Sequence, residues 1–205
     1  MSSSATVQTR QRQPKSQQQY VSWEQFQRVH MEREDGYEYE WLDGVVERTP
    51  YSMDKTQLFI LRNLQAFFRT LLFEQKVVGE LIAEADLFFG KHHRRPDVCW
   101  LTDEQIDRLA DDAREVPAFI IEIISNNDAI NRVNDKMQDY RLAGVQVVWQ
   151  IFPKQEHIHV YTGSALQHMT IYSGEEVCSA KPALSAFELE AEKIFEKKTT
   201  ANTTS

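Results

Sequence analysis

Two carboxylates stand in stretches of the chain that otherwise have the composition of buried β-strand. Asp97 begins an apolar segment after a proline, and Glu122 lies inside the apolar run 118–124. An ionised carboxylate among Val and Ile side chains is costly unless a cation or several hydrogen-bond donors meet it. For either residue alone, an ion pair with Arg94 or Arg95 is the simpler interpretation. The two together, on neighbouring strands, favour a site for Mg²⁺ or Mn²⁺, whose chemistry with phosphate is phosphodiester hydrolysis.

Two further groups could complete such a site. The backbone carbonyl of Ile123 lies beside the face of its strand that carries Glu122, so it is a candidate third oxygen ligand. From Glu122 to Ser125 the strand covers roughly 10 Å, and a helix from Asp128 to Lys136 runs back by about 12 Å. Lys136 then returns to the level of Glu122, where its ammonium could orient the attacking water and stabilise charge on the phosphorane. A surface lysine paired with an acidic neighbour on its own helix is equally compatible with the sequence.

One short basic run directly precedes the first carboxylate, and it comprises Lys91, His92, His93, Arg94 and Arg95. Lys91, Arg94 and Arg95 are candidate contacts to a phosphate backbone. The two histidines are expected in a solvated turn, because adjacent side chains on extended chain point in opposite directions and do not meet on one metal. The net charge of −8 argues against a broad basic face that would bind nucleic acid non-specifically.

Spacing of apolar residues and turn signals predicts the elements that must position these groups. Ser22 and Gln25 resemble a capping box, and Asp43-Gly44 is a hairpin turn signal. Helices are predicted over residues 23–33, 53–73, 103–109, 129–143 (capped from 126–128) and 185–195. Strands are predicted in the hairpin 37–48 and over 77–89, 95–101, 118–124, 145–152, 157–161, 167–172 and near 177. The fold class is α/β, with an α+β mixed sheet in which antiparallel hairpins lead into one parallel strand–helix–strand crossover, flanked by helices.

Length and composition predict one soluble domain. The 205 residues are enough for a single core, and 41% of them are hydrophobic. We expect a polar disordered arm over residues 1–20, one domain over 21–196 and a disordered tail over 197–205. No apolar run approaches the roughly 20 residues that span a bilayer, and no signal peptide is evident, so a cytoplasmic location and no membrane partner are expected. The two cysteines are expected to be buried, reduced residues.

Four motifs in this order resemble the Uma-type restriction-endonuclease-like family within the PD-(D/E)xK nuclease superfamily. They are Tyr39-Glu40-x-Leu42-Asp43-Gly44, Arg95-Pro96-Asp97-Val98, the strand 117–125 around Glu122, and Lys136-x3-Tyr140-x3-Gly144-Val145-x3-Trp149. The resemblance covers residues 23–195 and implies a restriction-endonuclease-like core and a Mg²⁺-dependent DNA endonuclease. Ile124 occupies the strand position where the superfamily usually has its lysine. The resemblance therefore implies that Lys136, on the next helix, is the catalytic lysine.

The resemblance also implies accessory residues and a partner. Glu84 corresponds to an acidic position on the strand before Asp97, Glu40 to one in the first hairpin, and Ser125 directly follows the glutamate strand. DNA is the expected partner. A homodimer is expected because many nucleases pair two active sites to cut two strands.

Other family positions differ in this chain. Asn126-Asn127 replaces the usual Pro-Ser, Val45 replaces a glutamate, Phe152 replaces an acidic residue, and no histidine opens the long helix near Lys55. These differences keep two alternatives open. One is a catalytically silent nuclease fold that acts as a binding or assembly module. The other is a hydrolase of small phosphodiesters.

Overall fold

The computed structural model describes residues 20–50, 55–111, 113–125 and 130–197. Almost all of the predicted arm and tail, and the helix caps predicted at 126–128, lie outside the described residues. The helices are α1 (Trp23–Phe26), the π-helical segment η1 (Gln27–Met31), α2 (Lys55–Phe73), α3 (Asp103–Ala110), α4 (Ile130–Ala143) and α5 (Ala191–Phe195). The strands are β1 (Tyr37–Leu42), β2 (Val45–Pro50), β3 (Glu80–Ala83), β4 (Leu87–Phe89), β5 (His92–Arg94), β6 (Val98–Leu101), β7 (Phe119–Ile123), β8 (Val147–Phe152), β9 (His157–Thr162), β10 (His168–Ser173), β11 (Val177–Ala180) and β12 (Leu184–Glu190).

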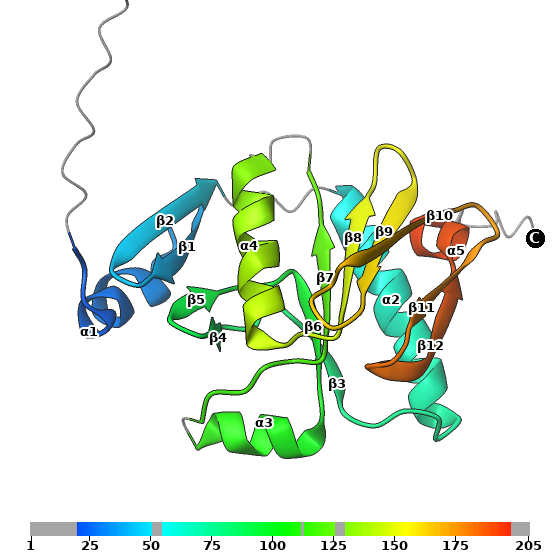
Figure 1. The fold of residues 1–205 in the computed structure, drawn as a ribbon, viewed down its shortest axis with the longest axis horizontal. Helices are drawn as coiled ribbons and strands as arrows, with labels where there is room; N and C mark the ends of the chain where they lie inside the picture. The colour runs from blue at the N-terminus through cyan, green and yellow to red at the C-terminus, as the bar shows by residue number, and fades with distance from the viewer. Residues whose placement is uncertain (1–19, 51–54, 112, 126–129, 198–205) are drawn as a thin grey trace, which may run out of the picture.

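The strands form three sheets. The central sheet has the order β10-β9-β8-β7-β6-β3, and a second sheet has the order β2-β1-β5-β4. A third, two-stranded sheet consists of β11 and β12. Figure 1 shows α4 beside β7 on one flank of the central sheet, with the β1–β2 hairpin next to it and α2 and α5 on the other side. The β7–α4–β8 unit is the predicted crossover, because β7 and β8 pair in parallel. None of the helices in the described ranges is long and apolar enough to span a membrane.

The central strand β7 faces two different cores. Phe119, Ile121 and Ile123 pack in the core that includes Ile60, Leu64 and Phe68 of α2. Ile120 packs in the second core, with Met137 and Tyr140 of α4. Because side chains alternate along a strand, Glu122 shares the α4 face with Ile120. The same alternation places Cys99 and Leu101 of β6 in the α4-side core, so Asp97, in phase with them, is directed to that face as well.

Most of the elements predicted from the sequence are present. The Ser22–Gln25 capping box and the Thr102 cap of α3 are both formed. The first hairpin turns at Asp43–Gly44, both with positive φ, as the turn signal predicts. Cys99 and Cys178 are buried and free.

The strand predicted over 95–101 is present as β6, but the prediction of one strand over 77–89 was wrong. This segment is divided into β3 and β4, which belong to different sheets, and Glu84, between them, has a φ of +53°. The basic run does not form a solvated turn but the strand β5, which pairs with both β1 and β4. His92 and Arg94 contact Asp139, whereas the ring of His93 lies against Trp23 and Phe88. The spacing of apolar residues cannot reveal a strand built in this way.

The prediction of a helix over residues 185–195 was half wrong. Residues 184–190 form β12, and only the five residues of α5 are helical. The buried residues Leu184, Phe187, Ala191 and Ile194 are spaced by three or four, which imitates a helix. The strand tolerates this spacing because its register with β11 shifts between Ser179 and Ala180, and such an irregularity breaks the two-residue period.

Gly79, which leads into β3, has a φ of +79°, and an added Cβ would lie 2.2 Å from the carbonyl oxygen of Leu101. Gly90 also has a positive φ, but an added Cβ would meet nothing within 4 Å. We predict that Gly90→Ala costs roughly 1–2 kcal/mol of unfolding free energy, from the left-handed backbone alone. Gly79→Ala should cost at least about 1 kcal/mol more, because the backbone of β6 must move. Urea denaturation of the two variants makes the comparison, and equal losses would contradict this packing of β3 on β6.

Candidate active site

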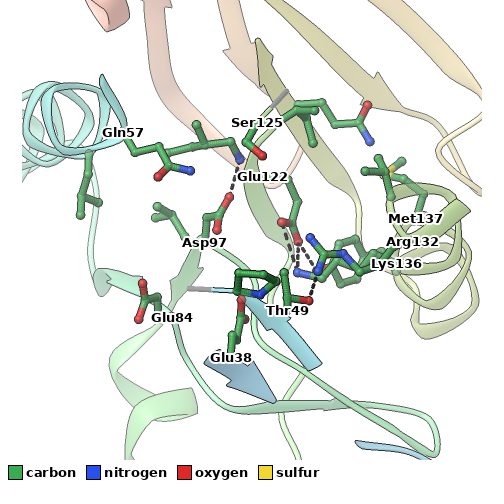
Figure 2. Close-up of a pocket in the computed structure, with 18 residues that line it drawn as sticks. Glu38, Thr49, Gln57, Glu84, Asp97, Glu122, Ser125, Arg132, Lys136 and Met137 are labelled. Carbon is green, nitrogen blue, oxygen red and sulfur yellow. Dashed lines mark hydrogen bonds and ion pairs between the residues drawn. The ribbon is translucent and has the colours of Figure 1, made fainter. Parts of the chain in front are cut away.

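Asp97 and Glu122 lie side by side at the end of the β6–β7 pairing. The last registered pair of this antiparallel ladder is Val98 with Ile121. One residue further out, the chain places Asp97 opposite Glu122, and both line the pocket shown in Figure 2. The structure thus brings together the two carboxylates singled out in the sequence, whereas Arg94 and Arg95 pair with other carboxylates.

Among the described residues, one hydrogen-bond donor contacts the Asp97 carboxylate. Its Oδ2 accepts a hydrogen bond from the backbone N–H of Ile123 at 2.5 Å. Burial, and next the negative charge of Glu122, raise the pKa of Asp97 well above its usual value. The pair therefore holds more negative charge than its surroundings stabilise.

Glu122 is 7% exposed and contacts two residues of α4. Lys136 Nζ lies 3.4 Å from each carboxylate oxygen, and the Tyr140 hydroxyl donates to Oε1. Burial raises the pKa of Glu122, and the charge of Lys136 and the Tyr140 hydrogen bond partly offset this effect. The helix arithmetic that placed Lys136 at the level of Glu122 agrees with this geometry.

Three segments of the chain contact the side chain of Lys136. Besides Glu122 on β7, its ammonium lies 3.4 Å from Oε1 of Glu40 on β1 and donates to the carbonyl of Arg95 at 3.1 Å. Burial lowers the pKa of Lys136, but the charges of Glu122 and Glu40 outweigh it, so the pKa is raised above its ordinary value. Lys136 is therefore a permanent cation and hydrogen-bond donor in this site.

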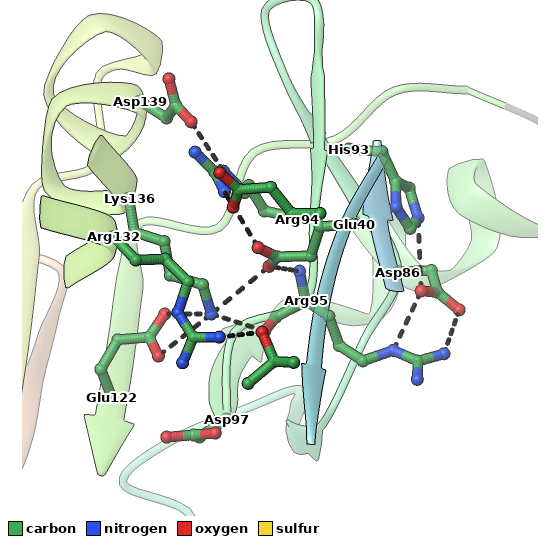
Figure 3. Close-up of polar contacts among 12 residues, drawn as sticks. Glu40, Asp86, His93, Arg94, Arg95, Asp97, Glu122, Arg132, Lys136 and Asp139 are labelled. Atoms are coloured by element: carbon green, nitrogen blue, oxygen red, sulfur yellow. Dashed lines mark hydrogen bonds and ion pairs between the residues drawn. The ribbon is translucent and has the colours of Figure 1, made fainter. Parts of the chain in front are cut away.

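A buried ion cluster lies behind Lys136, and Figure 3 shows its contacts. Arg94 is 1% exposed, and it donates to Glu40 at 2.9 Å and to Asp139 of α4 at 2.7 Å. The other oxygen of Glu40 accepts the backbone N–H of Arg95 at 2.9 Å. Glu40, predicted only as an accessory acidic residue, thus connects the first hairpin to both Arg94 and Lys136.

The pocket has a volume of about 350 Å³ and is lined by two further predicted residues, Glu84 and Ser125. The backbone N–H of Glu84 donates to the carbonyl of Asp97 at 3.2 Å, which holds the bend after β3 against the site. Ile123 also lines the pocket. Its backbone N–H is used by Asp97, and its role as a carbonyl ligand stays a prediction.

Sequence reasoning missed Glu38, which also lines the pocket. Burial raises its pKa to about 7, and Lys136 acts in the opposite direction. The signal was present, since Glu38 and Glu40 are two residues apart in a predicted hairpin and must share one face of β1.

Arg132 of α4 was also missed. It lines the pocket one helical turn before Lys136, and its guanidinium donates to the Thr49 hydroxyl of β2. An i,i+4 relation to the predicted lysine could have identified it, because such residues share a helix face. Arg132 and Thr49 connect the hairpin to α4 across the mouth of the pocket (Figure 2).

The predicted phosphate contacts in the basic run are not supported by the structure. Arg94 is buried in the ion cluster and does not reach solvent, so this prediction was wrong. Arg95 forms a two-point ion pair with Asp86, and Lys91 lies 3.4 Å from Asp43 on the exposed hairpin turn. These cations form ion pairs within the fold because more carboxylates than cations lie around them.

The donor set fits a hard divalent cation. Asp97 and Glu122 are neighbouring buried carboxylates, and oxygen is the ligand that Mg²⁺ and Mn²⁺ prefer. The raised pKa of Asp97 indicates a site that lacks positive charge. Among the described residues, no group of three or more His, Cys, Asp or Glu side chains is close enough to hold a metal. Mg²⁺ commonly uses one or two carboxylates and completes its shell with water and phosphate oxygens.

Removal of Arg94 should be costly. Arg94→Ala removes the buried cation that joins Glu40 to Asp139, and we predict a loss of about 3–5 kcal/mol in unfolding free energy. The matched control is Arg108→Ala, which removes an equally close but exposed pair with Glu115 and should cost less than about 1 kcal/mol. Urea denaturation measures both, and a similar small loss in each would contradict the central position of Arg94.

The charge of Asp97 should destabilise the metal-free fold. Because its pKa is raised in the folded state, the fold binds this proton more tightly than the unfolded chain does. The wild type should therefore gain stability as pH falls from above the folded pKa toward the usual value of 3.8. Asp97→Asn, which can still accept from Ile123, should melt higher than wild type at pH 8 in EDTA, and the difference should shrink by pH 5.

Thermal unfolding at both pH values measures this effect, and about 1 kcal/mol corresponds to roughly 2–4 °C in a protein of this size. Asp107→Asn, on the exposed surface of α3, is the control and should change neither midpoint. A lower midpoint for Asp97→Asn at pH 8 would show that the carboxylate is stabilised without metal.

Comparisons with known proteins agree with the fold. A crystal structure described as a putative nuclease belonging to DUF820, from Anabaena variabilis ATCC 29413, superposes with a TM-score of 0.67 at 18% sequence identity. The match covers 84% of this chain and 96% of that chain, and at this identity it shows the fold. A search of curated proteins finds no significant match. The family model described as Uma2, putative restriction endonuclease, matches residues 23–192. The chain therefore belongs to the Uma2 family and has the fold of its restriction-endonuclease-like nucleases.

Proposed function

We propose that this chain is a divalent-metal-dependent nuclease that hydrolyses phosphodiester bonds of DNA. The observation that carries the proposal is the meeting of Asp97, Glu122 and Lys136 in one pocket, from three different elements. Two buried carboxylates with too little compensating charge suit a hard cation, and a fixed lysine beside them suits an anionic substrate. Membership of the Uma2 family supports the same reaction class.

Asp97 and Glu122 are the residues that would hold Mg²⁺ or Mn²⁺. When bound, the metal supplies Lewis-acid activation of a phosphoryl oxygen and lowers the pKa of a coordinated water. The Asp97 carboxylate is kept in place by the Ile123 N–H, and Glu122 by Tyr140, so neither needs to reorganise on binding.

Lys136 contributes positive charge rather than a base. Its raised pKa keeps the ammonium protonated, so it donates to the attacking water or to a non-bridging oxygen as charge develops there. Arg132, one turn away on the same face, is positioned for the adjacent phosphate. Glu38 is the pocket carboxyl group best suited to accept the proton of the water, since its pKa of about 7 matches neutral solution.

Cleavage of supercoiled plasmid with Mn²⁺ or Mg²⁺ tests this assignment. Asp97→Ala and Lys136→Ala should each slow nicking by about 10²-fold or more, because each removes charge stabilisation at the reacting phosphate. Glu38→Gln should lower the rate less and flatten its rise with pH around 7. Lys154→Ala, on an exposed turn, is the matched control and should cut like wild type. Equal nicking by Asp97→Ala and wild type would exclude the proposed site.

One observation favours the alternative of a silent nuclease fold. Both oxygens of Glu122 already contact Lys136, and one of them also accepts from Tyr140. A carboxylate satisfied in this way could make the cluster purely structural. Calorimetric titration with Mn²⁺ separates the two proposals: binding that Glu122→Ala abolishes supports the nuclease, and no binding to the wild type supports the silent module.

A further inference from the structure

A second cavity lies on the other side of β5 from the candidate active site. It has a volume of about 440 Å³ and is formed by α1 and η1, the β4–β5 hairpin and the segment after α3. Apolar and aromatic residues, among them Trp23, Met31, Phe88 and Leu109, line it together with the charged residues Asp86, Arg114 and Glu115. The rings of Trp23 and Phe88 meet edge to face at 4.7 Å between centroids. A cavity of this size with an aromatic wall suits a flat ligand.

His93 gives this cavity a specific polar group. The side chain is 1% exposed, its ring lies 5.1 Å from that of Trp23, and it lines the cavity. Nδ1 is buried and has no hydrogen-bond partner among the described residues. Buried polar atoms of this kind are rare in folded proteins, because each forfeits about 1–3 kcal/mol of solvation.

The position of Asp86 determines whether His93 Nδ1, the nitrogen without a partner among the described residues, donates or accepts a hydrogen bond. Oδ1 of Asp86 lies 3.2 Å from His93 Nε2. In the neutral imidazole, a carboxylate there favours the tautomer with its proton on Nε2, which leaves Nδ1 as an acceptor. The missing partner is therefore an N–H donor on a flat ligand, as an amino-bearing nucleobase provides.

The cavity is physically connected to the candidate active site. Both oxygens of Asp86 accept from the Arg95 side chain, at 3.0 and 2.9 Å, and the Arg95 carbonyl accepts from Lys136 (Figure 3). His93 and Asp97 are four residues apart, so their separation is at most about 14 Å. At the stacked rise of roughly 3.4 Å per nucleotide, one strand covers this separation within about four nucleotides.

We propose that this cavity holds an unstacked nucleobase with an exocyclic amine, from the strand whose phosphate lies at Asp97 and Glu122. The inference rests on the proposed function. The base stacks on Trp23 and donates its amine to His93 Nδ1, and removing it from the helix costs least near an end or a mismatch. The cavity then adds base preference to a site that by itself contacts only phosphate.

The experiment is anisotropy of labelled hexanucleotides with the full chain in EDTA, where no cleavage occurs. An oligodeoxyadenylate should bind about fivefold or more tightly than the same hexamer of deoxynebularine, which is adenine without its amine. His93→Phe keeps the ring and removes Nδ1, so it should abolish this preference. Trp23→Leu should weaken both hexamers about tenfold, whereas Trp23→Phe should restore most of the affinity.

Three outcomes would overturn the proposal. Equal binding of the two hexamers to the wild type would exclude an amine contact. An unchanged preference in His93→Phe would place the contact elsewhere. Competition by free adenosine monophosphate at the affinity of the hexamer would assign the cavity to a mononucleotide rather than to a strand. Circular dichroism of each variant confirms its fold.

The experiment separates this inference from the proposed function. Asp97→Ala should lose cleavage of plasmid and keep the preference for the amine, because Asp97 does not line the second cavity. Loss of both properties in Asp97→Ala would contradict an independent base site. A protein that prefers the amine but never cleaves would retain the base site and lose the nuclease assignment.

Discussion

The buried guanidinium of Arg94 is the interaction on which the rest of this structure depends. It lies between Glu40 of the first hairpin and Asp139 of α4, in a position with almost no access to solvent. It is the one cation that contacts both of these buried carboxylates in the described part of the chain. Because the hairpin and α4 carry Glu38 and Lys136, respectively, the same ion cluster fixes the distance between two walls of the pocket. Burial of these charges costs free energy, but their ion pairs fix the hairpin and α4 relative to each other.

The pocket itself is left with a deficit of positive charge. Lys136 is shared between Glu40 and Glu122, so one ammonium serves two carboxylates, while Asp97 relies on a single backbone donor. Such an arrangement is poorly stabilised when empty and gains most from a ligand that brings positive charge. Poorly compensated charge at one place in a fold is typical of a site that serves binding rather than stability.

The sequence predicted the centre of the site better than its surroundings. The alternation of a strand and the rise of a helix made the meeting of Asp97, Glu122 and Lys136 possible, and the family resemblance favoured Lys136 over a surface lysine. Arg94 could not be recognised as a buried residue, because its partners lie 45 and 54 positions away in the chain. The last helix was predicted too long, because the irregular strand β12 has buried residues three or four positions apart, as a helix does. The periodicity of neighbouring residues thus predicted helices and strands well, but it could not predict ion pairs between residues far apart in the chain.

In two contacts that hold the site, one of the two residues contributes a main-chain atom and not a side chain. Lys136 donates to the carbonyl of Arg95, and Asp97 accepts from the N–H of Ile123. Every amino acid has a main-chain carbonyl, and every one but proline has an N–H, so substitutions at 95 and 123 leave these contacts available. The site can therefore persist while the side chains around it drift during evolution.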